Sequence, residues 1–191
     1  VHPFDDAELI AGQGTLGLEI VQDWPEVDAI IVPIGGGGLI SGVTMALKSL
    51  NPKIRVIGVE SSGAPAMKRS VEEGRLVTLD RVDCIIDGLR VKRVGATTFE
   101  VVRRFVDELV ALPDEQIVCL CERCSRAIEL VHNGNQRAAL LALRTAKELG
   151  QLDRVILGTD SPAGSGVQPL GILRVIAMLS SFGDLPAEQV F

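Results

Sequence analysis

Residues 29–42 read AIIVPIGGGGLISG, and this stretch decides the fold. The apolar run at 29–34 favours a strand, and the apolar periodicity of residues 39–50 favours a helix. Four consecutive glycines, residues 35–38, join the two segments. A strand, a tight turn and a helix in this order form the basic unit of a parallel α/β fold.

The four glycines also have the character of a phosphate-binding loop. Residues without a Cβ let the backbone approach an anion closely, while N–H groups and the positive end of the following helix attract negative charge. The sequence therefore predicts that a small anionic ligand or phosphate binds here. A strand-to-helix turn without a ligand is the alternative. The predicted binding residues are Gly35, Gly36, Gly37, Gly38 and Leu39, with Ser41 as a further candidate donor.

The alternation of strands and helices continues along the chain. It predicts a doubly wound, mostly parallel sheet in a Rossmann-like three-layer sandwich, forming a single α/β domain over residues 1–191. Thr97 and Glu100 form a predicted capping box for a helix that runs towards Asp107. The predicted helices cover residues 16–23, 39–50, 65–74, 136–149 and 169–181, with a further start at 113–115, and the predicted strands cover 29–34, 54–59, 109–112 and 155–158.

Two segments have less definite patterns. Residues 78–86 are mixed and are compatible with a short strand. Residues 127–131 have two readings, because local periodicity continues a helix to His132 whereas a family resemblance described below implies a strand. The sequence Asn133-Gly134-Asn135 breaks the chain in both cases.

Charge and composition exclude several functions. The formal net charge of −6 and the pI near 5.0 argue against binding to nucleic acid or to anionic membranes. No run of about eighteen apolar residues predicts a membrane span, and the first residues lack the pattern of a secretion signal. We therefore expect a cytoplasmic protein that binds neither nucleic acid nor membrane.

The cysteines do not form a predicted disulfide framework in a chain of this length. Cys119, Cys121 and Cys124 have a spacing that suggests zinc or cluster binding, with His132 as a further ligand. A fourth ligand at standard spacing is absent, so reduced thiols are the preferred interpretation and no metal site is predicted. The fourth cysteine is Cys84.

Several short motifs lie within residues 1–117. They are HPFDD at 2–6, IAGQGT at 10–15, VPIGGGGLISG at 32–42, VIGVE at 56–60, DGLRV at 87–91 and TTFE at 97–100. Together they resemble threonine dehydratases, which are pyridoxal-phosphate enzymes of fold type II. The resemblance implies that pyridoxal phosphate is held through its phosphate at the glycine turn, and that a homodimer forms.

In that family, the lysine that holds the cofactor covalently and the asparagine beside its ring precede the segment that resembles Val1. We therefore expect cofactor binding without turnover, and no catalytic residue is predicted. A chimeric folding scaffold without native activity and an active threonine ammonia-lyase are the alternatives. The lysines present are in contexts that are predicted to be exposed, and none is a good candidate for covalent chemistry. They are Lys48, Lys53, Lys68, Lys92 and Lys147.

The family resemblance also implies a cation site beside the cofactor. Its ligands would be the carboxylate of Glu60 and the carbonyl of Ala64. The position of Ala66 is often acidic in members that bind divalent ions, so alanine there departs from the pattern. A polar strand end at the sheet edge is the alternative role for Glu60.

From about Val118 the chain resembles a different family. Residues 128–135 (IELVHNGN) and 154–174 (RVILGTDSPAGSGVQPLGILR) are similar to the end of an amidohydrolase barrel, with enamidases as the comparison. This resemblance implies a chimera in which residues 118–191 are amidohydrolase-like. Asp160 matches the aspartate that assists metal binding and proton transfer in that family. Because the family's paired histidines have no counterpart, a loop-capping role for Asp160 is preferred.

Overall fold

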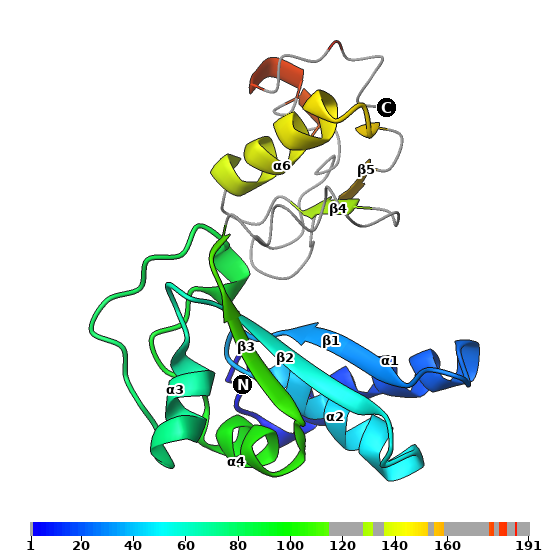
Figure 1. The fold of residues 1–191 in the computed structure, drawn as a ribbon, viewed down its shortest axis with the longest axis vertical. Helices are drawn as coiled ribbons and strands as arrows, with labels where there is room; N and C mark the ends of the chain where they lie inside the picture. Colours follow the sequence, from blue (N-terminus) through cyan, green and yellow to red (C-terminus); the bar gives the residue numbers. More distant parts are fainter. Residues whose placement is uncertain are drawn as a thin grey trace. The chain divides into compact units, whose positions relative to one another are not determined.

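In a computed structural model of the protein, the described residues are 2–114, 128–131, 136–152, 155–158, 176–177, 180–182 and 186. The chain divides into two compact units (Figure 1). Unit 1 comprises Val1–Cys84 and Gly88–Pro113, and unit 2 comprises Ile85–Asp87 and Asp114–Phe191. A single domain over residues 1–191 stays a prediction, and each unit is described separately.

Unit 1 contains a three-stranded sheet with the order β1-β2-β3. Its strands are β1 (Ala29–Pro33), β2 (Arg55–Ser61) and β3 (Glu108–Leu112). Both pairings are parallel, with Val32 opposite Gly58 and Gly58 opposite Leu109. Because parallel neighbours need a crossover connection, helices separate the strands in the chain. This confirms the predicted parallel α/β fold.

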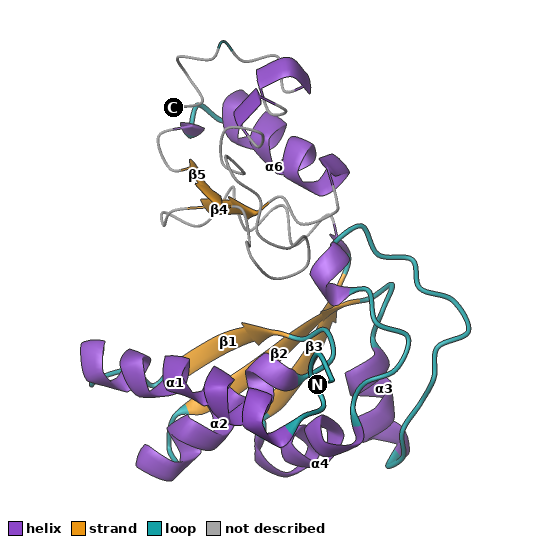
Figure 2. Cartoon of the chain, turned by 180° about the vertical axis from the view of Figure 1, so that it is seen from behind, coloured by secondary structure: helices purple, strands orange, loops and turns teal. Residues whose placement is uncertain are grey.

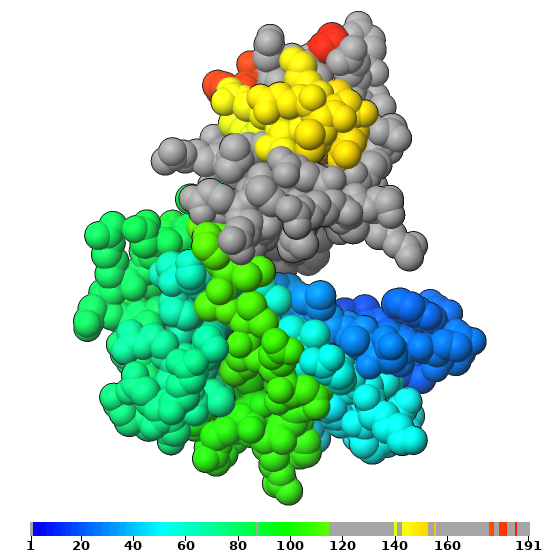
Figure 3. All heavy atoms as spheres, viewed as in Figure 1, coloured from blue at the N-terminus to red at the C-terminus, as the bar shows by residue number. Residues whose placement is uncertain are grey.

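Four helices accompany the sheet of unit 1: α1 (Ala7–Asp23), α2 (Gly38–Leu50), α3 (Ala66–Glu73) and α4 (Ala96–Phe105). In both ribbon views α1, α2 and α4 lie on the same side of the sheet (Figures 1 and 2). The space-filling view shows β3 at the surface of this unit (Figure 3). Within the part of the chain that the structure describes, every helix is too short or too polar to cross a membrane.

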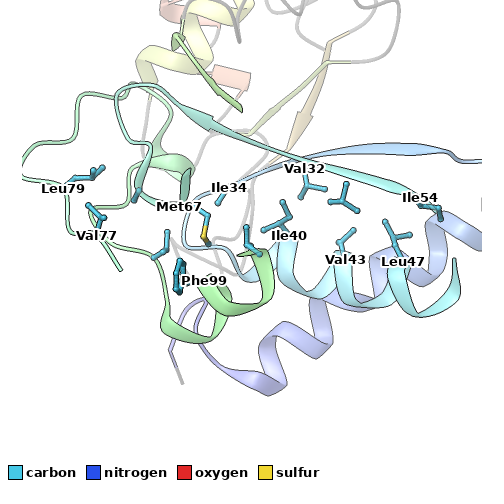
Figure 4. Packing of buried hydrophobic residues seen from close by; sticks show 14 of the residues in the cluster. Val32, Ile34, Ile40, Val43, Leu47, Ile54, Met67, Val77, Leu79 and Phe99 are labelled. Atoms are coloured by element: carbon cyan, nitrogen blue, oxygen red, sulfur yellow. The ribbon is translucent and has the colours of Figure 1, made fainter. Parts of the chain in front are cut away.

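The core of unit 1 lies between the sheet and these helices. Val32 points from β1 towards Ile40, Val43 and Leu47, which form one face of α2 (Figure 4). Their spacing of three and four residues puts them on one side of the helix, as predicted. Val56 of β2 belongs to the same buried cluster. The three α2 side chains are at most 1% exposed, so this face of α2 anchors the helix to the sheet.

Helix α1 begins nine residues before the position predicted from the sequence, at Ala7 rather than at Leu16. The carboxylate of Asp6 caps it by accepting hydrogen bonds from the N–H groups of Glu8 and Leu9 at 3.0 and 3.2 Å. Glycines in α1 weaken its local helix signal. Packing of α1 against α2 compensates for this weak local signal, so the helix is longer than the sequence pattern predicts.

Close backbone contact joins α1 to α2. A Cβ on Gly42 would lie 2.2 Å from the carbonyl oxygen of Ile10 and 2.6 Å from the nitrogen of Gly14. A Cβ on Gly17 would lie 2.9 Å from the Cβ of Ala46. The two helices pack this closely only because glycine occupies the crossing.

Two local predictions are wrong. Residues 78–86 form no strand, and a short 3₁₀ turn follows at Asp87–Leu89. The capping box of Thr97 and Glu100 is absent, because α4 begins at Ala96 with Gly95 as its N-cap. Glu100 instead pairs with Arg103 at 2.6 Å.

Unit 2 contains a separate two-stranded parallel sheet of β4 (Ile128–Val131) and β5 (Val155–Gly158). Its described helix is α6 (Gln136–Glu148), which ends near Gly150 with φ +67°. The strand reading of residues 127–131 is therefore confirmed over Ile128–Val131. Residues 169–181 are described only at 176–177 and 180–181, which are helical, so the rest of that predicted helix lies outside the described residues.

Candidate functional site

The glycine loop, defined as residues 35–38, follows the carboxyl end of β1 and leads directly into α2. Just before it, the N–H of Ile34 donates to the carbonyl of Val59 at 2.8 Å and extends the pairing of β1 with β2. In parallel sheets, the loops at the carboxyl ends of strands form the ligand-binding edge. The glycine loop is thus fixed at the edge where α/β folds bind ligands.

The first two glycines of the loop are in tight contact with other segments of unit 1. A Cβ on Gly35 would lie 2.3 Å from the carbonyl oxygen of Gly88. A Cβ on Gly36 would lie 2.0 Å from the Phe4 ring. The motifs at residues 2–6 and 87–91, which are far apart in the sequence, therefore meet at the loop. Packing alone requires glycine here, so the glycine run is not by itself proof of a ligand.

Free backbone N–H groups make a stronger case for an anion. Gly37 is the N-cap residue of α2 with φ +97°, and no side chain caps the helix. Among the described residues, none accepts a hydrogen bond from the N–H groups of residues 35–39. These groups lie at the positive end of the α2 dipole and are available to an external acceptor. An anion would satisfy them.

The carbonyl of Gly36 is held by α4. It accepts a hydrogen bond from the Thr98 hydroxyl at 2.8 Å and a longer one from the N–H of Gly95 at 3.4 Å. Thr98 is fully buried, and a Cβ on Gly37 would lie 2.8 Å from the Thr98 Cβ. The start of α4 therefore supports the glycine loop directly.

Asp5 fixes the start of α4. Its carboxylate accepts hydrogen bonds from the first backbone N–H groups of the helix. Although burial alone would raise the pKa of Asp5, these hydrogen bonds lower it below its ordinary value. The donors are Ala96 at 2.9 Å, Thr97 at 2.9 Å and Thr98 at 3.3 Å.

Glu60 is a buried carboxylate at the end of β2, 1% exposed. Its two oxygens accept hydrogen bonds from the N–H groups of Met67 and Lys68, both at 2.8 Å, and so cap α3. Burial raises the pKa of Glu60 to about 7, although the two hydrogen bonds oppose this change. Glu60 thus has a structural role as a cap, which adds to the sequence alternative of a strand end. The cation site with Ala64 stays a prediction.

Ser41 belongs to the first turn of α2, where its N–H donates to the carbonyl of Gly37 at 3.0 Å. Ser41 is fully buried, and its hydroxyl has no hydrogen-bond partner among the described residues. Lys48 binds the carboxylate of Asp107 at 2.7 Å and is only partly exposed, which corrects the expectation that it is exposed. Lys68 binds Glu72 at 2.9 Å. Neither lysine is free for covalent chemistry at the loop.

Several predicted residues fall outside the described part of the chain. They are Cys119, Cys121, Cys124, His132 and Asp160. Among the residues that are described, no group of three or more His, Cys, Asp or Glu side chains is arranged to hold a metal ion.

The sequence did not identify the residues that support the loop. Phe4, Thr98 and Gly88 belong to motifs that were noted for their family resemblance, but none was assigned a role. The motifs that contain these three residues could be found in the sequence. Their contacts with the glycine loop depend on tertiary packing, which the sequence does not show. No local pattern predicts that an aromatic ring covers Gly36.

Comparison with known proteins gives the family of the chain. Residues 1–159 match the family described as pyridoxal-phosphate dependent enzyme. The chain belongs to this family. Its members use pyridoxal phosphate as cofactor, which agrees with the cofactor predicted from the sequence.

Curated relatives narrow the comparison. The L-threonine ammonia-lyase of Geobacter sulfurreducens is 44% identical over 195 residues, with 97% of this chain and 48% of the relative covered. That of Thermotoga maritima is 50% identical over 117 residues, with 61% of this chain and 29% of the relative covered. The catabolic L-threonine dehydratase of Escherichia coli K12 is 48% identical over 117 residues, with 61% of this chain and 36% of the relative covered. The chain thus spans about half or less of these relatives.

Solved structures agree with the fold. The processed form of threonine deaminase isoform 2 from Solanum lycopersicum has a TM-score of 0.63 at 28% identity, covering 93% of this chain and 52% of that protein. Maize serine racemase has a TM-score of 0.62 at 30% identity, covering 95% of this chain and 55% of that protein. These similarities confirm an α/β fold like that of fold type II enzymes.

The comparisons also bear on the predicted junction near Val118. The family match continues to residue 159, and the Geobacter sulfurreducens relative covers 97% of the chain. Both therefore extend through residue 118. They lend no support to an amidohydrolase-like segment or to a chimera.

Proposed function

We propose that residues 35–39 bind the phosphate of pyridoxal phosphate. The observation that carries this proposal is the uncapped start of α2, where no described residue accepts the N–H groups of residues 35–39. A phosphate oxygen is a strong acceptor, and its negative charge is favoured at a helix N-terminus. The N–H groups of residues 35–39 are therefore suited to the phosphate of pyridoxal phosphate, the cofactor that the family uses.

The role of this site is to hold and orient the cofactor. When bound, pyridoxal phosphate supplies an electron sink for negative charge that develops on an amino acid. Gly37 and Leu39 would donate backbone N–H groups to the phosphate. Phe4 and Gly88 would keep the glycine loop in one conformation, which reduces the conformational cost of binding.

The reaction in which this site takes part is, in our proposal, the dehydration and deamination of L-threonine. The β-hydroxyl leaves as water, and hydrolysis of the resulting imine releases ammonia. This proposal rests on the relatives, since L-threonine ammonia-lyases are 44–50% identical to the chain. Unit 1 would supply the phosphate-binding wall, and its Lys48 and Lys68 form ion pairs with Asp107 and Glu72. Residues 1–191 are proposed to bind the cofactor without turning over substrate. A folding scaffold without activity is the alternative.

Binding is tested with inorganic phosphate and with pyridoxine 5′-phosphate, which has no aldehyde to react with lysines. Amide chemical shifts of ¹⁵N-labelled protein are followed during each titration. We expect saturable shifts centred on residues 35–39, and competition between the two ligands. Shifts that do not saturate, or that centre elsewhere, would contradict the proposal.

A matched pair of variants at Leu39 isolates the N–H group. Leu39→Pro removes one donor in the first turn of α2, where proline is compatible with a helix. Leu39→Ala shortens the same side chain and keeps the donor. We expect Leu39→Pro to weaken phosphate binding about tenfold, as expected for loss of one hydrogen bond to a charged group, and Leu39→Ala to bind like the wild type. Equal weakening in both variants would show that packing, not the N–H, matters.

A further inference from the structure

The peptide between Gly36 and Gly37 has one end fixed by protein and the other end free. Its carbonyl accepts the Thr98 hydroxyl at 2.8 Å, with the N–H of Gly95 at 3.4 Å. Its N–H, which belongs to Gly37, has no acceptor among the described residues. In a trans peptide the C=O and N–H point in opposite directions.

We propose that Thr98 is a positioning residue that aims the Gly37 N–H at the bound phosphate. By holding the Gly36 carbonyl against α4, the Thr98 hydroxyl forces the Gly37 N–H to point away from α4. Glycine peptides rotate readily, so without this hydrogen bond the peptide samples other orientations. This inference rests on the proposed phosphate site and adds a side chain that acts on it without touching the ligand.

Burial and capping make Thr98 suitable for this role. The residue is 0% exposed, so its hydroxyl does not exchange its partner for bulk water. Its own N–H is bonded to Asp5 at 3.3 Å, and its hydroxyl is also 3.2 Å from the carbonyl of Gly95. The bond to Asp5 therefore holds the backbone that carries the hydroxyl. The Gly36 carbonyl at 2.8 Å is the nearer of the two acceptors for the single hydroxyl hydrogen.

Van der Waals contact alone is a weaker explanation of this residue. Gly37 lies close to the side chain of Thr98, since a Cβ on Gly37 would be 2.8 Å from the Thr98 Cβ. Valine in place of threonine would keep this close packing. The hydroxyl is what distinguishes Thr98 from an apolar residue of the same shape. An experiment on the hydroxyl therefore separates orientation from packing.

Three variants test the hydroxyl. Thr98→Val removes it and keeps the shape, whereas Thr98→Ser keeps it. Thr44→Val is the matched control, because Thr44 is also 0% exposed but its hydroxyl has no partner among the described residues. The readouts are the ¹³C shift of the Gly36 carbonyl without ligand, the dissociation constant for inorganic phosphate from amide shifts, and the thermal unfolding midpoint.

We expect Thr98→Val to change the Gly36 carbonyl shift and to raise the dissociation constant for phosphate about tenfold, the effect of one misdirected hydrogen bond. Thr98→Ser and Thr44→Val should bind phosphate like the wild type. Unchanged phosphate affinity in a folded Thr98→Val protein would overturn the inference and leave the phosphate site intact. An equal loss of affinity in Thr44→Val would also overturn it, since any buried hydroxyl would then matter. Absence of phosphate binding in the wild type would instead overturn the proposed function on which the inference rests.

Discussion

The carboxylate of Asp5 accepts a hydrogen bond from the backbone N–H of Thr97 at 2.9 Å, although 92 residues separate the two in the chain. The same carboxylate also accepts the N–H groups of Ala96 and Thr98. Phe4, the preceding residue, covers Gly36 of the glycine loop. Residues 4 and 5 therefore connect the start of α4 to the glycine loop.

The first prediction concerns this long-range cap. Asp5→Ala should lower the free energy of unfolding by about 1–2 kcal/mol, because it leaves several N–H groups at the start of α4 without an acceptor. Asp5→Asn should lose less, since an amide oxygen still accepts. Urea unfolding at pH 7 measures both. An Asp5→Ala protein as stable as the wild type would show that water replaces the carboxylate at no cost.

Acid should affect the same cap. The hydrogen bonds lower the pKa of Asp5 in the folded protein, so its stabilising contribution is complete above the ordinary carboxylate pKa and is lost as pH falls through the folded value. Relative to Asp5→Asn, the wild type should therefore lose stability below about pH 4. Parallel pH profiles for the two proteins in that range would contradict this expectation.

A second prediction tests how closely Asp5 packs against the turn. A Cβ on Gly95 would lie 2.4 Å from the Cγ of Asp5, while the backbone there, with φ −70°, suits any residue. Gly95→Ala should therefore destabilise the fold by about 1–3 kcal/mol through this overlap alone. Gly12→Ala is the control, because open space surrounds Gly12 in α1 and alanine should stabilise the helix by about 0.5–1 kcal/mol. Thermal unfolding compares the two, and destabilisation by both would argue against a specific clash.

The fold was largely predictable from the sequence. The strands were correctly placed because they are short apolar runs, and α2 because its apolar residues recur with a period of 3.6 residues. Both features are local properties of the chain. Helix α1 was predicted too short, since its glycines reduce helix propensity while enabling contact with α2 through Gly42. The N-cap of α4 was missed because Asp5 is 91 residues from Ala96, beyond any local pattern.

The candidate site was predictable only in part. A glycine run between a strand and a helix indicated the position of the loop and the chemistry of its ligand. Sequence patterns could not show that Phe4 and Gly88 fill the space beside the glycines, or that Thr98 binds the Gly36 carbonyl. These contacts arise from segments that folding brings together, and local rules describe only neighbours in the chain.

A third prediction concerns the crossing of α1 and α2. Gly42→Ala places a methyl group 2.2 Å from the Ile10 carbonyl, so the helices must separate or α1 must detach. We expect destabilisation by about 1–3 kcal/mol and faster hydrogen exchange confined to α1. The matched variant is again Gly12→Ala, which adds a methyl group to α1 without overlap. Unchanged exchange in α1 for Gly42→Ala would contradict a tight crossing.

The fourth prediction addresses self-association, since a homodimer remains a prediction for this chain. Ile31 in β1 is 68% exposed, whereas its neighbour Ile30 packs against the core. Ile31→Lys should leave the unfolding free energy nearly unchanged and shift sedimentation towards the monomer, because exposed apolar strand residues favour association. Ile30→Lys should instead destabilise the fold. An unaltered sedimentation coefficient for Ile31→Lys would place any dimer contact elsewhere.

The fifth prediction follows from the buried cap of α3. Burial raises the pKa of Glu60 to about 7, above its unfolded value, so folding favours the protonated form. Its contribution to stability is complete below the unfolded pKa and is lost as pH rises through the folded pKa. From about pH 4.5 to 7, the wild type should lose roughly 2–3 kcal/mol relative to Glu60→Gln, which does not titrate. Urea unfolding of both proteins at several pH values measures this difference, and a constant difference would mean that folding does not change the pKa of Glu60.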